Sequence, residues 1–385
     1  MKISQMANRI EPSLTRKLFD MAKKYDNVID FTLGDPDYET PDYVKQAACD
    51  AIWAGKTKYA ANAGIIELRN VVSEVIERET GIHYDPATEI QITVGAMEAL
   101  YLTLCALIDP GDEVIIPSPH YVNYRHMTQM LNGVPVIVDS EEEHDFIVSA
   151  DDVLNAVTDK TVAIIINSPN NPTGTVYTRE SLEKICKIAV EKDIVVIWDE
   201  CYKSILYDGA KFVSVLDFPN MKDHAIVINS VSKRYSMTGW RVGYLAGPAE
   251  FVKDLPKLQE NIAACVTVPS QYAAIKALSG DDAASNMMRD GFEKRRNVLV
   301  EGINQIDKLS VKYPRGTFYA MVNIKKTGLK SEEFAYKLLE AVQVAVVPGI
   351  TYGQASEGFI RIAFTKNEDV IREGLARIKR FVDSL

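Results

Sequence analysis

Two cationic and two hydroxyl side chains follow one apolar strand of the sequence. The stretch VINSVSKRYSMTGWRVGYLAGP, residues 227–248, begins as a short apolar run and then places Ser230, Ser232, Lys233 and Arg241 close together. A lysine amine that is desolvated or near another cation is a nucleophile that forms Schiff bases with aldehydes. An arginine binds phosphate through two parallel hydrogen bonds, to which serine hydroxyls add. These residue types predict a site for a phosphorylated aldehyde.

A carboxylate follows a second apolar strand. In IVVIWDECY, residues 194–202, Asp199 and Glu200 come directly after apolar residues. A carboxylate at the mouth of a buried strand costs desolvation free energy unless a cation meets it, and a protonated pyridinium nitrogen would be such a cation. Tyr202 would then reach a phenolic oxygen on the same ligand. The alternative is that Asp199 is a helix N-cap.

Two turns add polar groups that fit the same ligand. In TVGAMEAL, Gly95 ends a strand and a helix begins at once, and the free N–H groups of a helix N-terminus attract anions. In INSPNNPTGTVY, Asn170 and Asn171 offer amide groups just past a strand. Each stretch has an alternative reading as a turn and nothing more.

A phosphate, a pyridinium, a phenolic oxygen and an aldehyde are all parts of one molecule, pyridoxal 5′-phosphate. Nucleotide motifs fit less well. The GKT at 55–57 resembles the end of a P-loop, but Asp50 stands where that motif needs glycine. The glycines at 239, 243 and 247 do not match GxGxxG. The residues therefore predict a pyridoxal phosphate site with Lys233 on the aldehyde and Arg241 on the phosphate.

The elements that must position these residues alternate between strand and helix. Several of the strands are continuous apolar runs, as expected where helices cover both faces of a sheet. The pattern predicts an α/β fold with a doubly wound, mostly parallel sheet, and ligands bind such sheets at the carboxyl ends of the strands. The predicted strands are 89–94, 112–117, 134–139, 160–168, 193–200 and 224–230, with helices at 96–108, 121–131 and 179–192.

The pattern changes beyond Asp281. A long helix around 282–305 precedes strands near 309–313, 317–324, 343–347 and 358–364 and helices near 331–341 and 367–383. This order predicts a smaller α+β domain. A chain of 385 residues also exceeds the size at which one core stops growing, which is about 250–300 residues.

Composition excludes several classes of protein. The net charge of −10 with no basic run disfavours nucleic acid and acidic membranes as partners. The N-terminus has no continuous apolar core, and no apolar run is long enough to span a membrane. The five cysteines form no CxxC pair and the five histidines lack metal-ligand spacing. We therefore expect a cytoplasmic protein without a metal site.

The chain resembles the class I/II aminotransferases of pyridoxal phosphate fold type I over nearly its whole length. The resemblance is carried, in the family's order, by LGDPDYETP, GKTKYAANAGIIELR, TVGAMEAL, SPHYVNY, NSPNNPTG, WDECY, NSVSKRYSMTGWRVGYLAGP and GFIRIAF. It implies a large pyridoxal phosphate-binding α/β domain over residues 41–285 and a small α+β domain over 286–385. Residues 1–40 would form an N-terminal segment that packs with the small domain.

The resemblance also implies roles for individual residues. Lys233 would be the Schiff-base lysine and the acid/base of proton transfer, and Asp199 would keep the pyridine nitrogen protonated. Asn171 and Tyr202 would bond the phenolic oxygen, and Tyr121 would stack on the ring. The phosphate would be bound by Gly95, Ala96, Met97, Ser230, Ser232 and Arg241, with either or both serines in contact.

Three more roles concern the substrate and a second subunit. Arg361 would bind the substrate α-carboxylate as a fork, with Gly34 beside it, although a charge at a strand edge is the alternative. Tyr59 would reach the phosphate in the neighbouring subunit, which implies a homodimer with shared sites.

The substrate is left open between several amino acids. Some aspartate-specific relatives carry a lysine at the position of Met97, and methionine is apolar and adaptable. This favours an aromatic and/or aspartate donor with 2-oxoglutarate as acceptor, unless a cation from the N-terminal RIEPSLTRK binds a distal carboxylate. The alternatives are an N-acetyl-diaminopimelate aminotransferase and a pyridoxal phosphate-dependent C–S β-lyase. A pyridoxal phosphate-binding transcription regulator would need a DNA-binding domain before FTLGDPD, where only some thirty residues stand.

Overall fold

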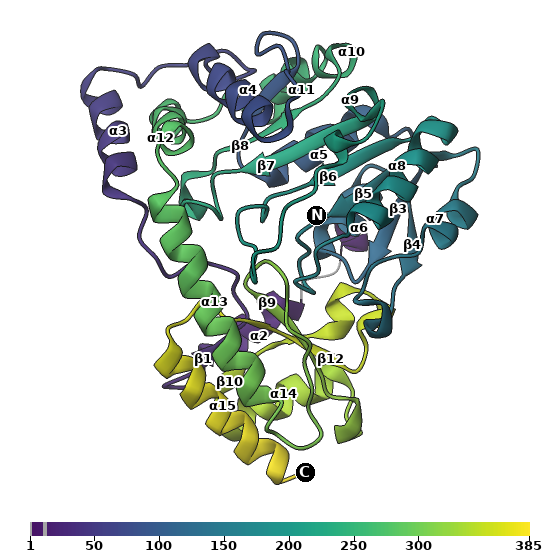
Figure 1. The fold of residues 1–385 in the computed structure, drawn as a ribbon, viewed down its shortest axis with the longest axis vertical. Helices are drawn as coiled ribbons and strands as arrows, with labels where there is room; N and C mark the ends of the chain where they lie inside the picture. The colour runs from purple at the N-terminus through teal and green to yellow at the C-terminus, as the bar shows by residue number, and fades with distance from the viewer. Residues whose placement is uncertain (1, 11–13) are drawn as a thin grey trace.

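A seven-stranded sheet forms the centre of the larger part of the molecule. The computed structural model describes residues 2–10 and 14–385. The strand order is β2-β8-β7-β6-β5-β3-β4, and β8 alone runs antiparallel to both of its neighbours (Figure 1). The strands are β2 (Ile90–Thr93), β3 (Glu113–Ser118), β4 (Val134–Asp139), β5 (Thr161–Asn167), β6 (Val195–Asp199), β7 (Ala225–Ser230) and β8 (Gly243–Ala246). The predicted doubly wound, mostly parallel sheet is confirmed.

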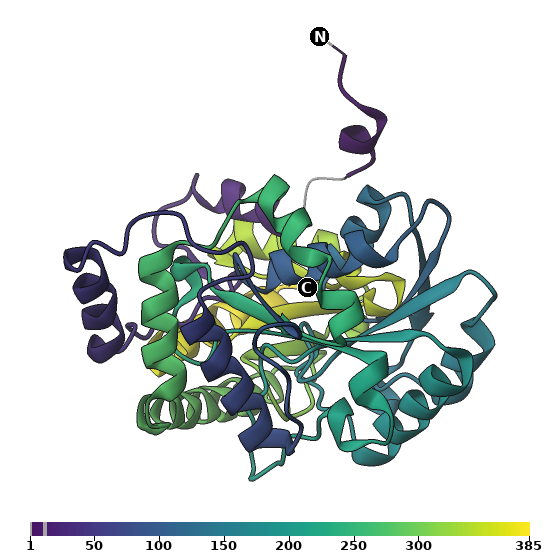
Figure 2. The ribbon, with the colours of Figure 1, turned by 90° about the horizontal axis from the view of Figure 1, so that it is seen from above.

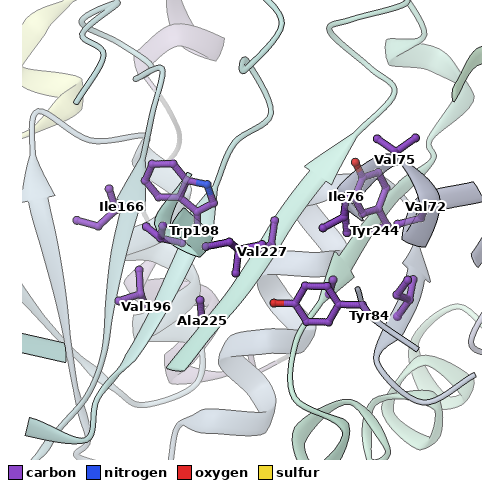
Figure 3. Close-up of a cluster of buried hydrophobic side chains, with 14 of the residues drawn as sticks. Val72, Val75, Ile76, Tyr84, Ile166, Val196, Trp198, Ala225, Val227 and Tyr244 are labelled. Atoms are coloured by element: carbon purple, nitrogen blue, oxygen red, sulfur yellow. The ribbon is translucent and has the colours of Figure 1, made fainter. Parts of the chain in front are cut away.

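Both faces of this sheet are covered by helices, as its apolar strands require. Along β5, Ile164 and Ile166 belong to the hydrophobic cluster on one face, and Ala163 and Ile165 belong to the cluster on the other. Side chains alternate along a strand, so a strand buried on both faces has no polar positions. Figure 3 shows Ile166 near Val196, Trp198 and other members of the first cluster.

Half of the helices around this sheet connect its strands, and the others precede β2 or follow β8. They are α3 (Asp42–Trp53), α4 (Ile66–Thr80), α5 (Ala96–Leu107), α6 (Val122–Met130), α7 (Ala150–Ala156), α8 (Arg179–Lys192), α9 (Met221–His224), α10 (Ala249–Val252), α11 (Leu255–Ile262) and α12 (Val268–Ser279). Within the described residues, no helix is both long and apolar enough to cross a membrane.

A second hydrophobic core surrounds a three-stranded antiparallel sheet of order β11-β12-β9. Its strands are β9 (Tyr319–Asn323), β11 (Val347–Pro348) and β12 (Phe359–Ala363), and a separate parallel pair joins β1 (Ile29–Asp30) to β10 (Val344–Ala345). The helices are α2 (Leu14–Ala22), α13 (Ala283–Ile303), α14 (Ser331–Val342) and α15 (Glu368–Asp383), whereas the short α1 (Gln5–Arg9) projects away from the rest of the chain (Figure 2). Figure 1 shows α13 running from the large sheet into this smaller part.

Two details of the secondary structure differ from the sequence prediction. The predicted strand at 309–313 is wrong, because only Ser310 forms an isolated bridge, to Asn323. Strand β8 was not predicted, because its apolar, buried run GYLA is only four residues long and follows the polar stretch after Lys233. The domain boundaries after residues 40 and 285 stay a prediction; the second of them falls inside α13.

Candidate active site

One cavity of about 480 Å³ lies at the carboxyl ends of the parallel strands and extends to the smaller sheet. It is lined by twelve of the residues singled out in the sequence: Gly34, Ala96, Met97, Tyr121, Asn171, Asp199, Tyr202, Ser230, Ser232, Lys233, Arg241 and Arg361. Gly95 lies directly behind the lining, and Tyr59 lies away from the cavity, fully on the surface. The cavity therefore brings together residues from seven separate segments of the sequence.

Asp199 is a half-buried carboxylate at the end of β6, and no cation among the described residues pairs with it. Its two oxygens accept hydrogen bonds from the Tyr124 hydroxyl at 2.6 Å and from the Cys201 backbone N–H at 3.1 Å. Burial raises the pKa of Asp199, against these two hydrogen bonds. No ion pair to Asp199 occurs in the described part of the chain, so a cationic ring nitrogen fits the charge that the site lacks. The alternative reading of Asp199 as a mere helix cap fails, since no helix begins there.

Lys233 presents its amine to the same cavity. Its Nζ donates to the Gly34 carbonyl at 2.7 Å and lies 5.7 Å from the centre of the Phe318 ring. Gly34 has no room for a side chain, because an added Cβ would lie 1.6 Å from the Tyr319 hydroxyl. The glycine therefore lets the backbone of the segment after β1 approach both Lys233 and the small sheet.

The start of α5 and Arg241 form a cradle for an anion. Gly95 has φ +75°, and a Cβ there would lie 2.4 Å from Arg241 Nη2. The Arg241 guanidinium donates to the carbonyls of Thr238 at 3.0 Å and Val94 at 3.3 Å, which aims it at the free N–H groups of α5. Helix N-termini and arginine forks are the groups that bind phosphate, and the buried Ser230 and Ser232 line the same wall.

Two polar groups lie between the carboxylate and the small sheet. The Tyr202 and Tyr319 hydroxyls are 3.1 Å apart, and burial raises the Tyr202 pKa well above its ordinary value. The Asn171 backbone N–H donates to Asn167 Oδ1 at 2.8 Å, which fixes the turn after β5. The side chains of Tyr202 and Asn171 are neutral and can donate hydrogen bonds, as binding of a ligand's phenolic oxygen requires.

Arg361 is a buried cation, and its hydrogen-bond partners among the described residues are neutral. It is 5 % exposed, and its fork donates to Asn171 Oδ1 at 3.1 Å and to the Thr32 carbonyl at 2.5 Å. Its Nε has no hydrogen-bond partner within the described chain. The guanidinium also lies over the rings of Tyr319 and Tyr352, at 4.4 and 5.1 Å from their centres. A buried guanidinium with an unused donor fits a ligand carboxylate, whereas a surface charge at a strand edge does not.

Met97, Tyr121 and Asn123 form a separate wall of the cavity. Asn123 Nδ2 lies 3.3 Å from Met97 Sδ and 3.1 Å from the Tyr121 hydroxyl. Burial raises the pKa of Tyr121 to about 12, so its hydroxyl stays protonated at neutral pH. This wall carries no charge, and the sequence analysis did not include Asn123.

Three further residues of the site were missed in the sequence. Tyr124 supplies the hydroxyl to Asp199, Tyr319 contacts Tyr202 and Arg361, and Thr32 supplies a carbonyl to Arg361. Tyr124 gave a weak signal, one helical turn after Tyr121 on a predicted helix. Tyr319 and Thr32 gave none, because their roles depend on contacts between distant parts of the chain.

The architecture and the contents of this cavity are those of a pyridoxal phosphate-dependent enzyme of fold type I. The profile of the family described as "Aminotransferase class I and II" matches residues 26–378, so the chain belongs to this aminotransferase family. The group that the site fits is therefore the family's own cofactor, pyridoxal phosphate.

Individual relatives agree with this assignment over their full length. The chain is 39% identical to the aromatic-amino-acid aminotransferase 2 of Thermococcus litoralis, covering 99% of this chain and 98% of that protein. It is 38% identical to an aspartate aminotransferase of Pyrococcus abyssi, with the same coverage. The solved structure of Thermus thermophilus aspartate aminotransferase with maleate superimposes with a TM-score of 0.94 at 35% identity, covering 99% of this chain and 100% of that one.

We expect Asp199→Asn to separate stability from activity. Asparagine keeps the size of the side chain but cannot hold a proton on a ring nitrogen, so kcat should fall by about 100-fold or more. Because the folded-state pKa of Asp199 is raised, the wild-type carboxylate costs stability as pH rises through that pKa. Without cofactor, Asp199→Asn should therefore melt higher than wild type at neutral pH and lose this advantage near pH 4.

Thermal melts of the cofactor-free proteins between pH 4 and 8, with steady-state kinetics, check this. The control is Glu183→Gln, which removes an exposed carboxylate of α8 and should change neither quantity. A melting temperature for Asp199→Asn that is lower than that of wild type at every pH would contradict the claim that the Asp199 charge lacks a cationic partner.

Proposed function

We propose that this aminotransferase moves the amino group of an L-amino acid, aromatic and/or aspartate, to 2-oxoglutarate by a ping-pong mechanism. The observation that carries the proposal is that the half-buried Asp199 carboxylate and the buried Arg361 guanidinium share a cavity with the Lys233 amine, and neither has an ion-pair partner among the described residues. An amino acid brings the carboxylate that Arg361 lacks, and the cofactor brings the cation that Asp199 lacks.

Each residue has a defined task in this proposal. When bound, pyridoxal phosphate supplies an aldehyde for the amino group and an electron-withdrawing ring that stabilises negative charge at the substrate Cα. Asp199 holds a proton at the ring nitrogen, and Lys233 Nζ takes the proton from Cα and returns it to the former aldehyde carbon of the cofactor, on the other side of the amino nitrogen. Arg361 and the Gly34 segment orient the substrate so that its Cα–H points at that amine.

The remaining residues hold the cofactor. Asn171 and Tyr202 donate to its phenolic oxygen, and Tyr121 stacks on its ring. The phosphate is bound by the backbone at Gly95, Ala96 and Met97, by the hydroxyls of Ser230 and Ser232, and by Arg241. The five unpaired cysteines support a cytoplasmic location, where thiols stay reduced.

Lys233→Ala tests the reaction itself. Removing the proton-transfer group should lower transamination by about 100-fold or more while 2-oxoglutarate and an amino acid still bind. The assay measures glutamate formed from 2-oxoglutarate with a panel of amino acids, and Lys187→Ala on the exposed face of α8 is the control.

Two results would redirect the proposal. Wild-type turnover by Lys233→Ala would remove Lys233 from the reaction. Pyruvate and ammonia released from a cysteine conjugate by the unmodified protein, without any 2-oxo acid, would indicate a C–S β-lyase.

The uncharged wall of Met97, Tyr121 and Asn123 supports a ring-sized or apolar side chain on the donor. A distal carboxylate placed there would meet a thioether, a hydroxyl and an amide but no cation. The other possible source of a cation, the N-terminal stretch 9–17, contains residues 11–13, which lie outside the described chain. The wall of Met97, Tyr121 and Asn123 is therefore the described feature that bears on substrate choice.

We expect phenylalanine or tyrosine to be used at least as well as aspartate. Burial of a ring contributes roughly 1.5–3 kcal/mol, which is about ten- to a hundredfold in kcat/KM. Met97→Lys should shift the ratio towards aspartate, because it adds a cation and removes apolar surface. Met97→Leu, which changes shape but not charge, is the matched control and should keep the aromatic preference.

The measurement is kcat/KM for aspartate, phenylalanine, tyrosine and N-acetyl-diaminopimelate on the three proteins. A wild-type preference for aspartate of more than about tenfold would show that a cation other than residue 97 binds the distal carboxylate. A preference for N-acetyl-diaminopimelate would identify the alternative aminotransferase.

We also propose a homodimer in which Tyr59 reaches the neighbouring subunit's phosphate site. Tyr59 is 90 % exposed and Trp53, at the end of α3, is 88 % exposed, so two large aromatic side chains of one segment face solvent in a single chain. Helix α3 lies at the outer edge of the molecule in both views (Figures 1 and 2). Aromatic residues of this kind are typical of protein interfaces.

Mixing two inactive variants tests the shared site. In a hybrid of Tyr59→Phe and Lys233→Ala subunits, one of the two sites has both residues intact. Statistical subunit exchange should therefore restore about a quarter of wild-type activity above that of each parent. The control pairs Lys233→Ala with Asp199→Asn, whose changes lie in the same cavity, and should restore nothing. Full activity from a protein that sediments as a monomer would contradict the shared site.

A further inference from the structure

A chain of charges runs from the interior to the surface and takes no part in lining the cavity. We call Glu200, Lys203, Glu79 and Arg234 the ion network. Lys203 Nζ bonds Glu200 Oε1 and lies 2.7 Å from Glu79 Oε2, and Glu79 Oε1 lies 3.2 Å from Arg234 Nη1. The network thus alternates in sign from Glu200 to Arg234.

The inner end of the network is almost fully enclosed. The Glu200 side chain is 2 % exposed and that of Lys203 is 10 % exposed. Glu200 also accepts hydrogen bonds from Trp198 Nε1 and Asn229 Nδ2, both at 3.0 Å. Burial raises the pKa of Glu200 and the Lys203 charge opposes that rise, so the two groups stabilise each other's charged forms.

The outer end reaches the helix that enters the smaller part of the molecule. Arg234 Nη2 lies 2.5 Å from Asp282 Oδ1, directly before α13. Glu79 lies in the last turn of α4. Burial raises the pKa of Glu79, but the charges of Lys203 and Arg234 bring it below its ordinary value. Glu79 is therefore ionised at neutral pH and joins the two cations.

The two ends of the network are covalent neighbours of the two residues assigned to catalysis. Glu200 follows Asp199 at the end of β6, and Arg234 follows Lys233 in the segment after β7. None of the four network residues lines the cavity. The network therefore links these two backbone segments through side-chain ion pairs, in addition to the pairing of β6 with β7.

We propose that Lys203 and Glu79 are positioning residues, which fix the separation between the turn that carries Asp199 and the turn that carries Lys233. The inference rests on the proposed roles of Asp199 and Lys233 and adds to them. A misplacement of about 1 Å between reacting groups costs on the order of 100-fold in rate, whereas binding tolerates it better. A network of paired charges resists such a shift because it would move the Lys203 ammonium away from Glu200 and Glu79, the two carboxylates that pair with it.

The test is Lys203→Met, which keeps the length of the side chain and removes its charge. We expect kcat to fall about tenfold or more, with KM for the amino acid and the affinity for pyridoxal phosphate changed less than about threefold. We also expect the near-visible circular dichroism of the bound cofactor to change, because that signal reports how the ring is held. Lys203→Arg, which keeps the charge, should restore both quantities.

Two further proteins keep the test decisive. Lys203→Met with Glu200→Gln removes both charges of the inner pair, so it should fold even where the single variant does not. This double variant should still have a lowered kcat and an altered near-visible circular dichroism of the bound cofactor. Lys184→Met breaks an exposed ion pair with Glu180 on α8 and should behave as wild type.

Three outcomes overturn the inference. One is a folded Lys203→Met with wild-type kcat and dichroism. The second is a double variant with wild-type kcat and dichroism. The third is that neither Lys203→Met nor the double variant folds. Each of these three outcomes would mean that the network contributes to stability alone. If Lys233→Ala itself were active, the proposed function would fail instead, and the two failures are thereby distinguished.

Discussion

The site depends on a half-buried carboxylate that no cation among the described residues neutralises. Asp199 has a hydroxyl and a backbone N–H as partners, and desolvation by the surrounding protein raises its pKa. A protein that only had to fold would replace such a group, because an uncompensated buried charge costs several kcal/mol. Its position at the end of β6 makes sense once a cationic ring is bound there. The same holds, with the sign reversed, for Arg361 and the substrate carboxylate.

The fold lets these opposite charges remain apart. Asp199 comes from the large parallel sheet, whereas Arg361 comes from β12 of the small antiparallel sheet. Between them lie Asn171, Tyr202 and Tyr319, which are neutral and hydrogen-bonded to one another or to the arginine. Neutral spacers prevent the two charges from pairing directly, which would remove the binding energy that each offers to a ligand.

Much of the site was predictable because parallel strands place their carboxyl ends together. Asp199 after β6, Asn171 after β5 and Lys233 after β7 each follow an apolar run, so periodicity alone brought them to one edge. Tyr319 and Thr32 were not predictable, since a contact such as Arg361 to Thr32 spans most of the chain and no local pattern specifies it. The strand predicted at 309–313 does not form, because strand formation also depends on a partner from elsewhere in the chain. Only Ser310 finds a partner, and a strand without one does not form.

Neighbouring acidic residues in WDECY show how one strand end serves two purposes. Side chains alternate along a strand, so Asp199 faces Tyr124 and the cavity while Glu200 faces Trp198 and Asn229 on the other side. Glu200 receives an internal cation, Lys203, and Asp199 does not. The paired carboxylate stabilises the turn without a ligand, and the unpaired one keeps its charge available for a ligand. Glu200 thus makes the backbone segment rigid, while the adjacent Asp199 binds the ligand. The Asp199 charge can stay unpaired because the ion pair of Glu200 already stabilises the same segment.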